Sequence, residues 1–167
     1  MPDAVLPATV EATSEVRAAP SSLWPLLCDP STPSKFSTEL ASARFVTAGG
    51  PRIGAIIEGR NVRGGFEWTT RSTVIACDEP TRFSWATGDE GDPTATWSFL
   101  VVGTDVASTL THRVILHPGK PPLSTAIERE PDRAREIVAT RLSELAENMD
   151  LTVKGIASIA EGQAREP

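Results

Sequence analysis

The sequence predicts an α+β fold in which a curled antiparallel sheet of seven strands packs against one long C-terminal helix. Three observations predict it. Apolar residues recur at intervals of three and four from residue 138 to residue 160, which is the period of one helix face. Seven shorter segments alternate between apolar and polar residues, as strands with one buried face do. Short turn signals separate the last six of these segments, and such connections join antiparallel neighbours.

Composition sets the limits of this fold. The chain has 167 residues, of which 40% are hydrophobic and 23% charged, which predicts one domain over 1–167 with a core at about 8–161 and a frayed tail at 162–167. The net charge of −6 and the lack of a basic cluster disfavour nucleic acid and anionic membranes as partners. No apolar run approaches the roughly 20 residues of a membrane span. The first residues lack signal-peptide features, and Cys28 and Cys77 form no motif, so we expect a cytoplasmic protein with reduced thiols.

The elements follow in order from their patterns. The first strand is expected over 8–17, with Val10, Ala12 and Val16 on one face. A short helix carries Leu23 and Trp24 and should start close to Pro25, because proline fits only the first turn of a helix. A second short helix is expected over 33–39 and a helical lead-in over 123–130. The six remaining strands are expected over 41–48, 54–62, 65–77, 82–87, 95–102 and 107–116.

The long helix is expected over 132–161, where one glycine, Gly155, and no proline occur. At 1.5 Å per residue it would be roughly 40–45 Å long, enough to cross a whole sheet. A coiled coil is the alternative, but the stripe lasts only about four heptads and would leave the strands uncovered. The apolar stripe consists of Val138, Leu142, Leu145, Met149, Val153, Ile156 and Ala160.

Four stretches of the chain together carry a family resemblance. They are 16–29 (VRAAPSSLWPLLCD), 54–61 (GAIIEGRN), 68–76 (WTTRSTVIA) with 80–85 (PTRFSW) after it, and the long terminal helix. In their order and spacing they resemble the START-like (SRPBCC, helix-grip) superfamily, in its polyketide cyclase/dehydrase branch. The resemblance implies a cavity between sheet and helix that holds apolar or aromatic small molecules. Because this superfamily contains both enzymes and carriers, the fold leaves the question of catalysis open.

Side-chain parity indicates which residues would line such a cavity. Alternate residues of a strand face the same way, and the apolar set should face the helix. Each candidate has a structural alternative: core packing for the tryptophans and Met149, a hydrogen-bonded core position for His112, and backbone capping for Asn61. Arg60 and Arg63 are expected to be solvated. The candidate ligand-binding residues are Trp24, Asn61, Trp68, Thr70, Trp85, Trp97, His112 and Met149.

The chemistry that the sequence offers is limited. Two histidines and two cysteines are too scattered for a metal site, and no glycine-rich phosphate loop exists, so we expect neither metal nor cofactor. His112 is the one catalytic candidate, because a neutral-range imidazole suits proton transfer. Cyclases similar to this chain use a pocket arginine with tyrosine or another hydroxyl. Here tyrosine is missing, and Arg71, Arg82 and Arg113 fall on the outward face.

Two main hypotheses result. The first is a protein that binds or transports an apolar or aromatic small molecule, lipid-like or polyketide-like. The second is a cyclase or dehydratase in which His112 moves a proton while Asn61 or Thr70 holds a carbonyl. A third, an interaction module that uses the outer helix face, is suggested by Leu151, which lies off the apolar stripe. The sequence is compatible with a monomer or a homodimer.

Overall fold

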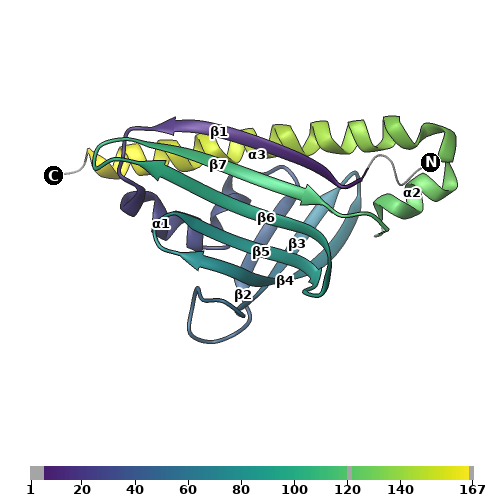
Figure 1. Cartoon of the computed structure of the whole chain (residues 1–167), viewed down its shortest axis with the longest axis horizontal. Helices are drawn as coiled ribbons and strands as arrows, with labels where there is room; N and C mark the ends of the chain where they lie inside the picture. Colours follow the sequence, from purple (N-terminus) through teal and green to yellow (C-terminus); the bar gives the residue numbers. More distant parts are fainter. Residues whose placement is uncertain (1–5, 120–121, 166–167) are drawn as a thin grey trace.

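The computed structural model describes residues 6–119 and 122–165, and its elements follow the predicted order (Figure 1). A first strand, β1 (Ala8–Val16), leads into α1 (Pro20–Cys28) and the 3-10 helix η2 (Thr32–Lys35). Six further strands are β2 (Leu40–Phe45), β3 (Ile56–Arg63), β4 (Phe66–Asp78), β5 (Arg82–Asp89), β6 (Asp92–Gly103) and β7 (Ser108–Leu116). They are followed by α2 (Leu123–Arg129), the 3-10 turn η3 (Pro131–Arg133) and α3 (Ala134–Ala164).

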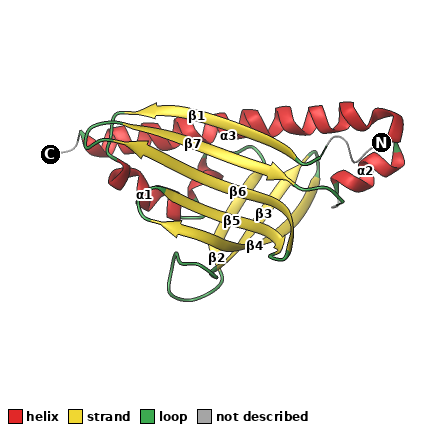
Figure 2. Cartoon of the chain, viewed as in Figure 1, coloured by secondary structure: helices red, strands yellow, loops and turns green. Residues whose placement is uncertain are grey.

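The strands form one antiparallel sheet in the order β1-β7-β6-β5-β4-β3-β2. Figure 2 shows it as one curled layer with α3 lying along it, which confirms the predicted fold class. Pairing is in register across the middle of the sheet, where Phe99 on β6 stands opposite Phe83 on β5 and His112 on β7. An irregularity on β4 between Val74 and Ala76 reverses the inward parity there, so Cys77, opposite Phe83, packs on the core cluster that contains Val74.

Helix α3 has 31 residues and buries the predicted stripe, apart from half-buried Leu142. It starts and ends slightly later than expected and continues to Ala164. Its main contact with the sheet is along β1, at one edge (Figure 1). Val153, Ile156 and Ala160 pack there into the largest core cluster. Because α3 rests on one edge, it covers the middle strands without filling the space above them.

The short helices correct two expectations. Helix α1 starts at Pro20, so Pro25 lies inside it and not in its first turn. Proline there gives up one intrahelical hydrogen bond, and the burial of Leu23, Trp24 and Leu27 on the sheet side compensates for that loss. The second helix is a single 3-10 turn, η2, shorter than the predicted 33–39. In the described ranges, no helix has both the length and the apolar character needed to cross a membrane.

Candidate ligand cavity

A cavity of about 800 Å³ lies between the concave face of the sheet and α3. Inward side chains of β3 to β7 form its floor, and Leu145, Met149 and Thr152 of α3 form its roof. Its mouth is bordered by α2 and by the β3–β4 hairpin, where Phe66 is 78% exposed. The volume falls within the roughly 300–1,000 Å³ of sites that enclose small organic ligands.

Stacked aromatic rings form the wall of the cavity on β5, β6 and β7. The rings of Trp85 and Trp97 are nearly parallel, at 5°, with centroids 6.2 Å apart. Phe99 and His112 stack at 4.3 Å. Cross-strand pairing brings the two rings of each pair together, because Trp85 stands opposite Trp97 and Phe99 stands opposite His112 on the neighbouring strand. The wall therefore offers flat apolar surfaces whose orientation the sheet fixes.

His112 differs from its neighbours because it is polar and has no partner. The side chain is 4% exposed, and neither Nδ1 nor Nε2 makes a hydrogen bond within the described part of the chain. Burial lowers the pKa of His112 to about 3, so the imidazole is neutral at physiological pH. A neutral imidazole has one donor nitrogen and one acceptor nitrogen. It can therefore bind a ligand hydroxyl or carbonyl that reaches the ring.

A strip of small polar groups lies on the β3–β5 side of the cavity. Asn61 Nδ2 donates to Thr70 Oγ1 at 3.4 Å, and Thr70 Oγ1 donates to the Gly59 carbonyl at 3.4 Å. Both bonds are long and therefore weak, which leaves these groups able to bind a ligand. Gly59 is needed here, because a Cβ would lie 2.9 Å from Thr70 Oγ1. Further along, Ser72 and Thr87 share a 2.9 Å hydrogen bond.

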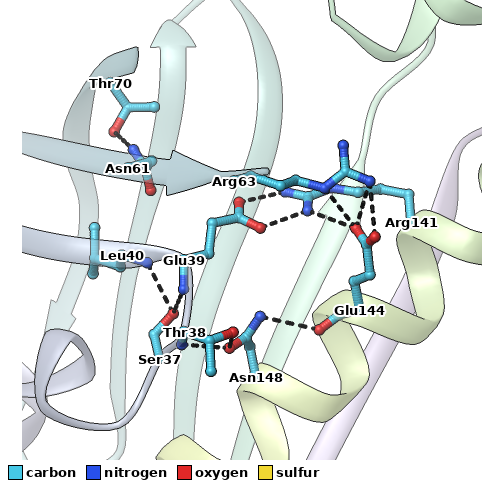
Figure 3. A network of polar contacts seen from close by, with 10 residues as sticks. All are labelled: Ser37, Thr38, Glu39, Leu40, Asn61, Arg63, Thr70, Arg141, Glu144 and Asn148. Atoms are coloured by element: carbon cyan, nitrogen blue, oxygen red, sulfur yellow. Dashed lines mark hydrogen bonds and ion pairs between the residues drawn. The ribbon is translucent and has the colours of Figure 1, made fainter. Parts of the chain in front are cut away.

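A network of charged side chains, which we call the rim, joins β3 and residue 39 to α3 (Figure 3), and its members Glu39, Arg63 and Arg141 line the cavity. Arg63, at the end of β3, donates to both carboxylate oxygens of Glu144 on α3 at 2.9 and 2.8 Å. Arg141, one turn earlier, donates twice to Glu39 at 2.6 Å. Arg141 also donates to Glu144 at 3.3 Å and so joins the two pairs. The hydrogen bonds from Arg63 hold the pKa of Glu144 below its ordinary value.

Residues 36–39, which we call the strap, link this rim to the helix. The backbone N–H and the hydroxyl of Thr38 both donate to Asn148 Oδ1, at 2.7 and 2.9 Å (Figure 3). Ser37 Oγ accepts from the backbone N–H groups of Glu39 and Leu40 at 3.1 and 2.9 Å. The strap therefore has a defined conformation although it contains no helix or strand.

Most of the residues proposed from parity lie around this cavity. The seven that border it are Asn61, Trp68, Thr70, Trp85, Trp97, His112 and Met149. Trp24 is not among the residues that line it. Its ring meets Phe83 edge-on at 6.3 Å and 86°, in a core cluster with Cys28 and Val74. Strand parity could not place Trp24, because α1 sets its direction.

Sequence reasoning missed the charged rim. Arg63 was expected to be solvated, and Glu144 and Arg141 fell on the polar faces of the predicted helix. The spacing of Arg141 and Glu144 does signal an i,i+3 pair. The contacts to Arg63 and Glu39 join residues 81 and 102 positions apart, which no local pattern indicates.

The cysteines and the other possible metal-binding side chains are the remaining candidate groups. Burial raises the pKa of the Cys28 thiol to about 12, so this thiol is protonated at neutral pH. Within residues 6–119 and 122–165, no three His, Cys, Asp or Glu side chains gather in a way that could hold a metal ion.

Comparison with known families agrees with this architecture. Residues 7–150 match the model of a family described as "Polyketide cyclase / dehydrase and lipid transport". The chain belongs to this family. No curated protein sequence matches the chain. Within the family description, both enzymes and lipid carriers are named, which matches a fold built around an internal cavity.

Solved structures show that the family fold is shared along nearly the whole chain. A polyketide-cyclase-like protein of Corynebacterium glutamicum is 22% identical, with a TM-score of 0.68 over 94% of this chain and 93% of its own. The Zhui aromatase/cyclase from Streptomyces sp. R1128 is 14% identical, with a TM-score of 0.66 over 95% and 96% of the two chains. The di-domain aromatase/cyclase StfQ of the steffimycin biosynthetic pathway is 16% identical, with a TM-score of 0.73 over 93% of this chain and 51% of its own.

Proposed function

We propose that this polyketide cyclase/dehydrase family protein binds and carries an apolar or aromatic small molecule, lipid-like or polyketide-like. The observation that supports this function is the cavity of about 800 Å³, which combines an aromatic wall with a neutral, unpartnered His112. Burial of ligand surface against such a wall would supply most of the affinity, at roughly 25 cal/mol per Å². The few polar groups would orient the ligand.

The arrangement favours a particular orientation of the bound molecule. A flat ring would lie against the parallel faces of Trp85 and Trp97. A hydroxyl or carbonyl at its inner end would pair with His112, whose nitrogens are otherwise unsatisfied. On the other side, Asn61 and Thr70 would bind a second polar group, since their mutual hydrogen bond is long.

A cyclase or dehydratase is the second candidate, because two of the three similar structures described above are named aromatase/cyclases. Two observations weigh against His112 as its proton-transfer group. A pKa of about 3 makes the imidazole a weak base at neutral pH. In addition, neither ring nitrogen is oriented by a carboxylate or carbonyl within the described chain. The same properties suit an uncharged binding group, which is why binding is the better-supported function.

Fluorophore binding tests the proposal directly. The uncharged probe N-phenyl-1-naphthylamine should bind the purified protein and quench tryptophan emission, because Trp85 and Trp97 line the cavity. Met149→Trp should abolish binding, since Met149 is in the roof and 2% exposed. Leu151→Trp adds the same ring to the outer face of the same helix, where the side chain is 46% exposed, and should bind as the wild type does.

Three results would argue against the proposed site: no probe binding, equal binding by both variants, or unfolding of Met149→Trp alone. The last result would indicate a filled core, because overpacking costs roughly 1–3 kcal/mol. Native mass spectrometry of freshly purified protein would then identify a copurifying compound and with it the ligand class.

A further inference from the structure

The strap makes three contacts along one face of α3. Glu39 pairs with Arg141, and Thr38 bonds to Asn148 seven residues further on. Another seven residues on, the ring of Phe36 packs so closely on Gly155 that a Cβ there would lie 2.3 Å from it. Seven residues are about two helical turns, so all three helix positions lie on the same face. The strap therefore runs antiparallel to α3 beside the cavity.

The strap borders the cavity next to β3, toward the sheet edge opposite β1. At the β1 edge, α3 packs directly on the sheet. Toward the opposite edge, polar bridges join α3 to the rest of the fold: Arg63 reaches Glu144 from β3, and the strap reaches Arg141 and Asn148 (Figure 3). Ser37, Glu39 and Asn148 all border the cavity.

The two ends of the strap are held differently from its middle. Phe36 packs on the large core cluster, and the Glu39 carbonyl accepts a hydrogen bond from the Val62 N–H of β3 at 2.9 Å. Within the described residues, the hydrogen bonds between the middle of the strap and α3 come from Thr38 and the Glu39 carboxylate. When polar groups of this kind separate, water can replace the lost hydrogen-bond partners. Separating packed apolar groups would instead expose apolar surface to water, which costs free energy.

We infer that the strap is a gate whose latch consists of the Glu39–Arg141 ion pair and the Thr38–Asn148 hydrogen bonds. The inference rests on the proposed function, because it concerns the passage of the ligand. When the latch opens, Thr38 and the Glu39 carboxylate move away from α3, while Phe36 stays on Gly155 and the Glu39 carbonyl stays bonded to Val62. The mouth then widens along the rim formed by Arg63 and Arg141. Closing the latch restores the wall around the bound molecule.

A reversible cross-link tests whether the strap must move. Thr38→Cys with Asn148→Cys places two thiols where the bonded side chains now meet. After oxidation with glutathione disulfide, the association and dissociation rates of N-phenyl-1-naphthylamine should both fall by roughly tenfold. Reduction with dithiothreitol should restore both rates. The wild type, which keeps Cys28 and Cys77, controls for oxidation at the native thiols.

A second variant tests the latch without a cross-link and applies even if the double variant does not fold. Glu39→Gln keeps the shape of the side chain and removes its charge, so both rates should rise by roughly tenfold while the Kd stays within about twofold. Glu136→Gln, in an exposed pair with Arg133 on the same helix, should leave both rates unchanged. Equal rates in the oxidised and reduced cross-linked protein, or in Glu39→Gln and wild type, would overturn the gate. Failure of the wild type to bind the probe would overturn the proposed function, and the gate with it.

Discussion

At the scale of single residues, His112 is the most informative side chain. A structural histidine in a core normally has a hydrogen-bond partner for each buried nitrogen. Among the residues that the structure describes, neither nitrogen has one, although the ring is well packed against Phe99. A buried polar group that is left unsatisfied costs about 1–3 kcal/mol. An apolar ring at this position would therefore remove no hydrogen bond to another described residue.

The cost of burying an unsatisfied imidazole predicts that an apolar ring at position 112 makes the fold more stable and the binding of a hydrogen-bonding ligand weaker. His112→Phe should raise the free energy of unfolding at pH 7 by about 1 kcal/mol, measured by urea denaturation. It should weaken the affinity for a hydrogen-bonding ligand by a similar amount. His117→Phe is the control, because His117 bonds to Thr96 at 2.9 Å and should lose stability when changed. A marked loss of stability in His112→Phe would contradict the unsatisfied state.

The pKa of His112 also predicts a pH dependence of stability. Its folded-state pKa of about 3 lies below the ordinary value of 6.5, so the unfolded chain takes up the proton first on acidification. The contribution of His112 is complete above pH 6.5 and is lost as the pH falls toward 3, by at most about 1.4 kcal/mol per pH unit. Urea denaturation between pH 4 and 8 should show that this slope is smaller in His112→Phe. Parallel curves for the two proteins would contradict the lowered pKa.

At the scale of elements, α3 was predictable and the strap was not. The burial of Leu145, Met149 and Val153 follows from the 3.6-residue period, which is a local property of the sequence. Strand parity likewise predicted the inward positions of Trp85 and Trp97. The strap has no period, and its partners lie more than a hundred positions away in sequence. Its role becomes visible only when the fold brings residues 36–39 against the helix.

The two glycines of α3 test the close approach of the strap. Alanine usually favours a helix over glycine by up to about 1 kcal/mol. At Gly155 that gain should be outweighed, because a Cβ would lie 2.3 Å from the Phe36 ring and the ring would have to move. Gly155→Ala should therefore lose about 1–3 kcal/mol of unfolding free energy.

Gly162→Ala provides the matched control, since a Cβ at that position meets no atom within 4 Å. This variant should be as stable as the wild type or slightly more stable. Thermal and urea denaturation of both variants would measure the difference. A Gly155→Ala protein as stable as Gly162→Ala would mean that Phe36 is not held against the helix.

At the scale of the whole molecule, the cavity results from how the helix sits in the sheet. The sequence predicted both elements and most of the inward residues, but it could not predict the space between them. That space depends on α3 resting on β1 at one edge. It depends also on Ala95 and Gly59, which are small and line the floor. The packing of Trp24 in a core cluster could not be predicted for the same reason, because the placement of α1 is a tertiary property.

Binding of a ligand in the cavity should stabilise the fold as a whole. A ligand that binds only the folded chain at 100 times its Kd adds about 2.7 kcal/mol. In a chain of 167 residues, that should raise the Tm by roughly 5–10 °C. Saturating N-phenyl-1-naphthylamine should therefore raise the Tm of the wild type and of Leu151→Trp but not of Met149→Trp. An equal rise in all three proteins would place the probe outside the cavity, and no rise despite tight binding would show that it binds the unfolded chain equally well.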